Sequence, residues 1–192
     1  MQDAPRLLLV RHGETEWNRA GRIQGGKDSP LTSLGREHAE RQARVFERLK
    51  PKVSDMPLFV SPLERARLTA RIALPAYPQI VDQRLTEIAC GAWEGLCPEE
   101  RAAGWPDLAA SCQSDLDLYV KAPGGEGLDA IEARVANFLN DLDAPSIVVA
   151  HKVVLIVARG LLRGLGRDAL HDLHAPQGVV IEIENGQETH LI

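Results

Sequence analysis

The sequence predicts an α/β protein, built as a three-layer α/β/α sandwich around a mostly parallel central sheet. Short apolar runs alternate with longer segments of helical periodicity, which is typical of a sheet covered by helices on both faces. The run at residues 7–10 is too short and too apolar to alternate, and residues 146–150 read “SIVVA”, so we expect both strands to be buried. The 192 residues show no repeat or linker, and one domain is expected over residues 1–192.

Strands are expected wherever a short apolar run is bounded by polar or turn residues. In chain order they cover residues 7–10, 57–60, 79–81, 146–150 and 178–184. After Val179 and Val180 the last run alternates apolar with acidic side chains. Such alternation is typical of a strand with one solvated face, so we expect this strand at a half-exposed edge of the sheet.

Helices are expected between these strands. The first long helix should begin after Thr32 or Ser33, because either side chain can cap it and Glu37 follows in the opening turns. It should reach about Leu49, and Pro51 should stop it. The remaining helices are expected at residues 63–74, 107–120, 128–142 and 153–162.

Composition argues against several classes of function. The net charge of −5 gives no electrostatic basis for binding nucleic acid or a membrane surface. No window approaches the roughly 18 apolar residues of a membrane span, and the N-terminus lacks a secretory signal. The cysteines Cys90, Cys97 and Cys112 are odd in number and lack paired zinc spacing. We therefore expect a cytoplasmic protein, monomeric or homodimeric.

Charged side chains follow the expected buried strands at the point where each strand ends. Arg11 and His12 follow residues 7–10, Arg65 lies in the segment after residues 57–60, and His151 follows residues 146–150. Because the carboxyl ends of parallel strands meet at one edge of a sheet, these side chains should share a crevice. The inference rests on the strands being parallel neighbours.

Such a cluster suits phosphoryl transfer. Guanidinium groups bind phosphate oxygens in a planar fork, and they stabilise the charge on a transferring phosphoryl group. A histidine between them is held neutral by the nearby cations, and a neutral imidazole nitrogen is a competent nucleophile. The departing alcohol then needs a proton, for which “LTEIACGAWEG” offers Glu87 and Glu94.

Motifs along most of the chain resemble those of the histidine phosphatase superfamily, which includes the cofactor-dependent phosphoglycerate mutases. The most specific is “RHGETEWN” at residues 11–18, and “IQGGKDSPLTSLGREHA” follows it. The later motifs come in the family's order: “SPLERARLTA”, “LTEIACGAWEG”, “PGGEGLDAIEARV” and “VVAHK”. The resemblance implies a phosphoglycerate mutase-like fold with neither a cofactor nor a metal ion.

The resemblance also implies a role for each matching residue. His12 would be the phosphorylated nucleophile, and Glu87 would protonate the leaving group and later activate water. The phosphoryl group would be held by Arg11, Arg65 and His151. Further contacts, to the phosphoryl group or to the rest of the substrate, would come from Asn18, Gln24 and Gly25.

Two positions depart from the family's pattern. Lys152 follows His151 where the family usually has glycine, so it either adds a cation near the pocket or points away. Gly127 replaces the serine of a G-E-S motif, which removes a hydroxyl that could cap the next helix or touch substrate. These changes concern substrate contacts more than the chemistry.

Another possible site is weaker. His171 and His174 are spaced i, i+3, which can serve a metal, but no third ligand stands out nearby. We expect them to make local or solvent contacts.

The expected function is metal-independent hydrolysis of a small phosphate monoester through a phosphohistidine. The alternatives are mutase-type phosphoryl transfer and a non-catalytic phosphate-binding module. The family's mutases are generally longer, which favours the phosphatase, and the intact nucleophile, arginine pair and acid argue against the non-catalytic module. A variable region at about 92–126, with aromatic and basic residues, is expected to cover the substrate; it contains Arg101, Trp105, Tyr119 and Lys121.

Overall fold

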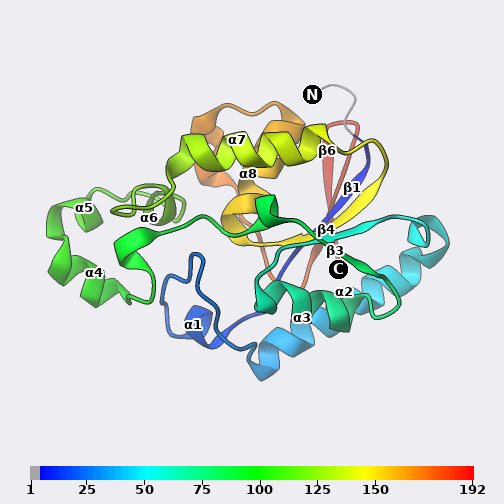
Figure 1. Ribbon diagram of the computed structural model, residues 1–192, viewed down its shortest axis with the longest axis horizontal. Helices are drawn as coiled ribbons and strands as arrows, with labels where there is room; N and C mark the ends of the chain where they lie inside the picture. The colour runs from blue at the N-terminus through cyan, green and yellow to red at the C-terminus, as the bar shows by residue number, and fades with distance from the viewer. Residues whose placement is uncertain (1–4) are drawn as a thin grey trace.

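A six-stranded sheet forms the centre of the protein in the computed structural model, which describes residues 5–192 (Figure 1). The strand order is β3-β2-β4-β1-β5-β6. The strands are β1 (Leu7–Arg11), β2 (Leu58–Val60), β3 (Gln79–Val81), β4 (Ser146–Ala150), β5 (Val180–Glu184) and β6 (Gln187–Leu191).

The four strands β1 to β4 are parallel, and the strands at the C-terminal end of the chain are not. The β1 and β4 strands pair from Leu7 opposite Ser146 to Arg11 opposite Ala150. The β5 strand pairs antiparallel to β1, and β6 pairs antiparallel to β5. The sheet is therefore mostly parallel, as predicted.

Helices cover both faces of the sheet (Figure 1). On one face, Leu8 and Val10 pack with Phe46 of α2 (Ser33–Val53) and Ala66 of α3 (Glu64–Ala73). On the other face, the core includes Leu7 and Leu9 of β1 with residues of α7 (Gly127–Asn140) and α8 (Lys152–Arg163). Because successive side chains of β1 point to opposite faces, one strand contributes to both cores. This arrangement confirms the three-layer sandwich.

Helix α2 begins as predicted and ends later than predicted. Thr32 is its N-cap, and its side-chain oxygen accepts a hydrogen bond from the Gly35 N–H at 2.9 Å. The prediction that Pro51 stops the helix is wrong, because α2 continues to Val53. The Val53 side chain is buried in the core, and its carbonyl accepts a hydrogen bond from the Tyr77 hydroxyl at 3.1 Å. Packing and this bond hold the last turn past the proline.

The single helix predicted at residues 107–120 is wrong. The segment forms two short helices, α5 (Pro106–Ala110) and α6 (Asp117–Val120), with a turn between them. The Asp117 carboxylate accepts a hydrogen bond from the Gln113 N–H at 2.8 Å, and the Ser114 hydroxyl accepts one from the Asp117 N–H at 3.1 Å. These side chains compete with the helical bonds of the backbone and break the helix.

The predicted edge strand is an interior strand. β5 lies between β1 and β6, so the edge belongs to β6, which the sequence pattern did not predict. Asn185 and Gly186 join the two strands with φ values of 52° and 72°. Positive φ at both turn residues is typical of the two-residue hairpin loops that Asn-Gly favours.

Short helices and loops connect the larger elements. These are α1 (Glu16–Arg19), η1 (Gln83–Leu85), η2 (Gly91–Trp93), α4 (Pro98–Gly104) and η3 (Arg167–Asp172). Together with α5 and α6, η2 and α4 make up most of the region predicted to cover the substrate. Within residues 5–192, none of the helices has the length and apolar character that crossing a bilayer requires.

Candidate active site

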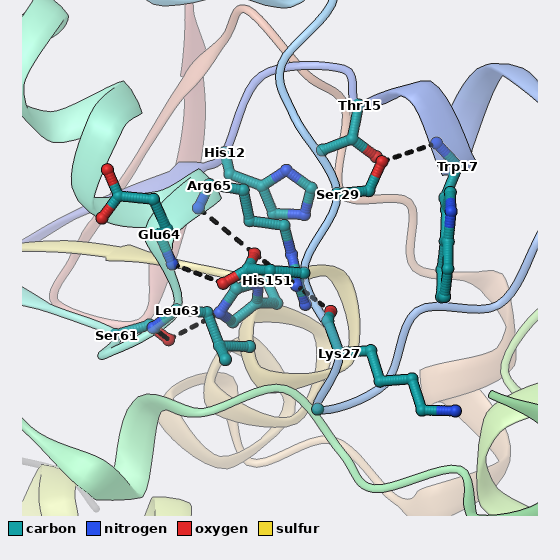
Figure 2. Close-up of polar contacts among 12 residues, drawn as sticks. His12, Thr15, Trp17, Lys27, Ser29, Ser61, Leu63, Glu64, Arg65 and His151 are labelled. Carbon is teal, nitrogen blue, oxygen red and sulfur yellow. Dashed lines mark hydrogen bonds and ion pairs between the residues drawn. The ribbon is translucent and has the colours of Figure 1, made fainter. Parts of the chain in front are cut away.

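The ends of β1, β2 and β4 bring the predicted residues together. Arg11 is the last residue of β1, and the His12 N–H donates to the Ala150 carbonyl of β4 at 3.1 Å. His151 follows β4 directly, and its ring centroid lies 5.1 Å from that of His12. Arg65, in the first turn of α3, lies beside both histidines (Figure 2). The expected juxtaposition at one sheet edge is therefore present.

The backbone determines which nitrogen of His12 carries a lone pair. The His12 Nδ1 atom lies 2.7 Å from the Gly13 carbonyl oxygen, which can only accept a hydrogen bond. Nδ1 is therefore the N–H donor, and Nε2 holds the lone pair. Gly13 is required here because a Cβ would lie 2.0 Å from the Gly35 carbonyl oxygen. Burial, and then the charges of Arg65 and Arg11, hold the pKa of His12 well below its ordinary value.

His151 is oriented by Ser61, the residue after β2. Its Nε2 lies 2.6 Å from the Ser61 hydroxyl, and that hydroxyl already accepts a hydrogen bond from the Leu63 N–H at 3.3 Å (Figure 2). Among the described residues this buried hydroxyl has no other acceptor, so its proton is donated to Nε2, which leaves the ring hydrogen on Nδ1. His151 Nδ1 is buried and has no partner in the described chain. Burial and the charge of Arg65 lower the pKa of His151 well below its ordinary value.

The guanidinium of Arg65 is fixed by the loop before α2. Its Nη1 donates to the Lys27 carbonyl at 2.5 Å (Figure 2). Nη1 also donates to the Asp28 carboxylate at 3.0 Å, and Nη2 donates to the Gly25 carbonyl at 2.9 Å. The remaining Nε–H is buried without a partner in the described chain. An unsatisfied buried donor is costly, so this one favours an anion beside it.

Arg11, the residue before His12, is held in a similar way. Its Nη1 donates to the Ala175 carbonyl at 2.8 Å, and its buried Nε has no partner among residues 5–192. Burial lowers the pKa of both Arg11 and Arg65, yet a guanidinium keeps its charge at neutral pH. Two fixed cations therefore flank a neutral histidine.

Glu87 and Glu94 differ in what they contact. The Glu87 carboxylate is buried, and it accepts hydrogen bonds from the Ile88 N–H at 3.0 Å and the Val153 N–H at 3.2 Å, the latter in the first turn of α8. Glu94 accepts from the Gly26 N–H at 2.9 Å and the Cys90 N–H at 3.1 Å. Glu94 thus ties two loops together, whereas Glu87 faces the same cavity as His12.

A small cavity of about 10 Å³ lies over His12, which is room for about one water molecule. Every predicted site residue except His151 lines it, together with two residues that had no assigned role. The lining residues are Arg11, His12, Asn18, Gln24, Gly25, Arg65, Glu87, Tyr119 and Lys152. His151 touches the His12 ring instead. The structure thus places Lys152 at the pocket, one of the two alternatives left open by the sequence.

Sequence reasoning missed two positioning residues. Ser61 follows a buried strand directly, as His12 and His151 do, and that position was an available signal. The Gln177 side-chain amide donates to the His12 carbonyl at 3.1 Å and to the Asn18 side-chain oxygen at 3.2 Å. Gln177 lies in a loop between η3 and β5, where no pattern marks it.

The described residues hold no group of three or more His, Cys, Asp or Glu side chains arranged for a metal ion. His171 and His174 therefore do not form a metal site within residues 5–192. The His171 Nδ1 atom contacts the Ser114 hydroxyl at 2.7 Å, which is a contact between distant segments and not the local contact expected for His171.

Comparison with known families agrees with this geometry. A sequence model of the histidine phosphatase superfamily, branch 1, matches residues 7–191. The chain belongs to the histidine phosphatase superfamily. The fold is the one found in solved structures of that superfamily.

Several of the curated relatives and solved structures are phosphatases, and a probable phosphoglycerate mutase of Enterobacter sp. is also among the relatives, 35% identical over 78% of this chain and 70% of that protein. Phosphoserine phosphatase 1 of Hydrogenobacter thermophilus is 33% identical, over 77% of this chain and 71% of that protein. The adenosylcobalamin/α-ribazole phosphatase of Salmonella typhimurium is 33% identical, over 90% of this chain and 87% of that protein. The structure of the α-ribazole phosphatase from Shigella flexneri matches with a TM-score of 0.79 at 27% identity, over 97% of this chain and 95% of that one. The chain is a phosphatase of this superfamily.

Proposed function

We propose that the protein hydrolyses a small phosphate monoester in two steps, through a phosphohistidine at His12 and without a metal ion. The hydrogen bond from His12 Nδ1 to the Gly13 carbonyl carries this proposal. It fixes the tautomer in which Nε2 is the nucleophile, and burial, together with the cations Arg65 and Arg11, keeps the ring neutral by lowering the pKa of His12.

In the first step, His12 Nε2 forms a bond to phosphorus while the bond to the leaving oxygen breaks. Glu87 donates a proton to that oxygen, so the alcohol leaves neutral. The Arg11 and Arg65 guanidiniums and the His151 Nδ1–H stabilise the charge on the transferring phosphoryl oxygens. Asn18 and Gln24 line the same cavity and supply further polar contacts.

In the second step, water attacks phosphorus while the Glu87 carboxylate removes its proton. The bond to His12 Nε2 breaks and inorganic phosphate departs, which restores both side chains. The two arginines supply the positive charge that a metal ion supplies in other phosphatases. A mutase would instead return the phosphoryl group to a second hydroxyl.

The named relatives act on phosphoserine and α-ribazole phosphate, which differ widely in the leaving alcohol. In the present chain, we assign the choice of leaving alcohol to the region at about 92–126. We infer that this region belongs to a single domain over residues 1–192. Cys90, Cys97 and Cys112 are free thiols. Free thiols suit a reducing compartment, so we infer a cytoplasmic phosphatase.

The proposal is tested by rapid-quench trapping with a ³²P-labelled phosphate monoester in excess EDTA. We expect base-stable, acid-labile label on the wild-type protein, followed by release of inorganic phosphate. His12→Ala should trap no label and should lose about 10⁴-fold or more in turnover while remaining folded. Label on serine or aspartate, loss of turnover in EDTA, or isomerised product in place of phosphate would each contradict the proposal.

A further inference from the structure

Lys152 stands where the family usually has glycine, and it lines the same cavity as the nucleophile His12. It is the first residue of α8, and its Nζ contacts the Asp115 carboxylate. The same Nζ lies 5.2 Å from the centroid of the Tyr119 ring, within the range of a cation–π interaction. The ammonium is thus held between an aromatic ring and a carboxylate.

The two partners of this ion pair belong to different cavities. Lys152 and Tyr119 line the small cavity over His12, whereas Asp115 lines a neighbouring cavity of about 660 Å³. The Lys152–Asp115 contact therefore joins a residue of the reaction cavity to a residue of the larger cavity. The small cavity holds about one water molecule, so a substrate larger than that must open this contact or another part of the wall.

The exposure of the two side chains is unequal. The Lys152 side chain is 13% exposed and the Asp115 side chain is 69% exposed. If the contact opens, Asp115 remains hydrated at little cost, whereas the ammonium of Lys152 is left largely desolvated beside Arg11. Lys152 therefore needs an anion in place of Asp115.

We propose that Lys152 determines specificity by binding a carboxylate on the substrate's leaving group in exchange for Asp115. This inference rests on the proposed phosphatase function, and it narrows the substrates to small phosphate monoesters that carry a carboxylate. Arg11 and Arg65 serve the phosphoryl group, which leaves Lys152 for a second charge. A carboxylate is chosen because the group that Lys152 holds now is itself a carboxylate.

The inference is tested by a ratio of kcat/KM values for matched substrates. Carboxymethyl phosphate and 2-carboxyethyl phosphate are compared with 2-hydroxyethyl and 3-hydroxypropyl phosphate. We expect the wild type to prefer the carboxylated esters, and Lys152→Met to lower the ratio by about 10- to 100-fold. Lys152→Arg should keep most of the preference, and Asp115→Asn should raise it because the competing carboxylate is gone.

Lys121→Met is the matched control. Lys121 also pairs with an aspartate of the covering region, Asp117, at 3.1 Å, but it lines only the larger of the two cavities. An unchanged ratio in Lys152→Met, an equal fall in Lys121→Met, or a fall in Asp115→Asn would overturn the inference. Failure of the proposed function looks different: p-nitrophenyl phosphate would not be hydrolysed, or His12→Ala would still hydrolyse it.

Discussion

The floor of the site and the segment that covers it are built in opposite ways. The floor consists of residues at or just after the ends of parallel strands that are far apart in the sequence. Its histidines, Ser61 and Arg65 are buried. The cover, about residues 92–126, consists of helices of four to seven residues joined by turns. Its ion pairs lie partly in solvent, as the exposed side chain of Asp115 illustrates.

This difference in construction suits the floor to the reaction and the cover to the selection of the substrate. Every polar group of the floor has its orientation fixed by backbone or side-chain partners, which pre-organises it for the charge of a phosphoryl group. Pairs in the cover contribute little to stability because water screens them, so they can exchange partners. Substitutions in the floor should therefore affect the reaction, whereas most substitutions in the cover should affect only which substrate is accepted.

Apart from loss of the nucleophile itself, the largest effect on the reaction is expected for Glu87→Gln. With an alkyl phosphate, phosphorylation of His12 should slow by about 10²- to 10⁴-fold, because the leaving alkoxide lacks a proton donor. With p-nitrophenyl phosphate the loss should be far smaller, since that leaving group needs no proton. Single-turnover bursts measure this step apart from hydrolysis of the phosphoenzyme.

Glu94→Gln is the matched control for the acid. Its carboxylate joins the Gly26 and Cys90 N–H groups, so the variant should lose thermal stability without dependence on the leaving group. Equal losses of Glu87→Gln on both substrates would remove Glu87 from the acid role. A dependence on the leaving group that appears only in Glu94→Gln would transfer the role to that residue.

Acid should destabilise the folded protein through the two buried histidines of the floor. The pKa values of His12 and His151 are lowered by burial, so below about pH 6.5 the unfolded chain binds protons that the folded protein does not. The free energy of unfolding should therefore fall from pH 6.5 to 5, by up to about 1.4 kcal/mol per pH unit for each histidine. Denaturant unfolding at each pH measures the slope.

His151→Gln should remove part of that slope and leave the part due to His12 and His38, whose pKa values burial also lowers, and Lys121→Met in the cover should leave the whole slope intact. The window ends near pH 5 because carboxylates with lowered pKa values, such as Asp82, begin to contribute below it. A wild-type slope of zero between pH 6.5 and 5 would mean that both histidines accept protons in the folded protein. That result would contradict the neutral nucleophile.

A smaller effect is expected for Ser61→Ala. The variant removes the hydrogen bond that orients His151, and kcat for p-nitrophenyl phosphate should fall about 10-fold with less change in KM. Ser61→Thr keeps the hydroxyl and should retain more of the activity. If kcat were unchanged in Ser61→Ala, the orientation of His151 would not matter to the transferring group.

The smallest effect is expected in the cover. Glu100 lies on α4, where it pairs with Arg22 at 2.7 Å and accepts a hydrogen bond from the Cys97 N–H at 2.7 Å. Glu100→Gln should leave kcat/KM for p-nitrophenyl phosphate within about twofold, because an exposed pair contributes little. A loss as large as that of Ser61→Ala would show that the cover positions the catalytic groups as well.

The sequence predicted the floor well because its signals are local. A buried strand followed by a charged residue marks Arg11 and His151, and Thr32 marks the start of α2. What it did not predict depends on contacts between distant segments. Gln177 reaches His12 from a loop after η3, and only the folded chain brings them together.

The errors in the fold have similar causes. β6 reads “QETHL”, without an apolar alternation, because it is a polar edge strand, although Asn185–Gly186 was an available hairpin signal. The helix predicted at residues 107–120 was broken by the side chains of Ser114 and Asp117, which favour local turns. Periodicity alone could not distinguish the broken from the continuous helix.

The position of β1 between β4 and β5 has a consequence for how the protein comes to exist in a cell. Synthesis proceeds from the N-terminus, so β1 and the nucleophile that follows it are made before either neighbour of β1. Both strands that flank β1 are made long after it, since β4 is Ser146–Ala150 and β5 is Val180–Glu184. Strand pairs of such high sequence separation form slowly. Until β4 and β5 pair with it, the apolar strand β1 has both edges unpaired. A nascent chain is therefore catalytically silent until β4 and β5 have been made, and the onset of activity reports that both strands have paired with β1.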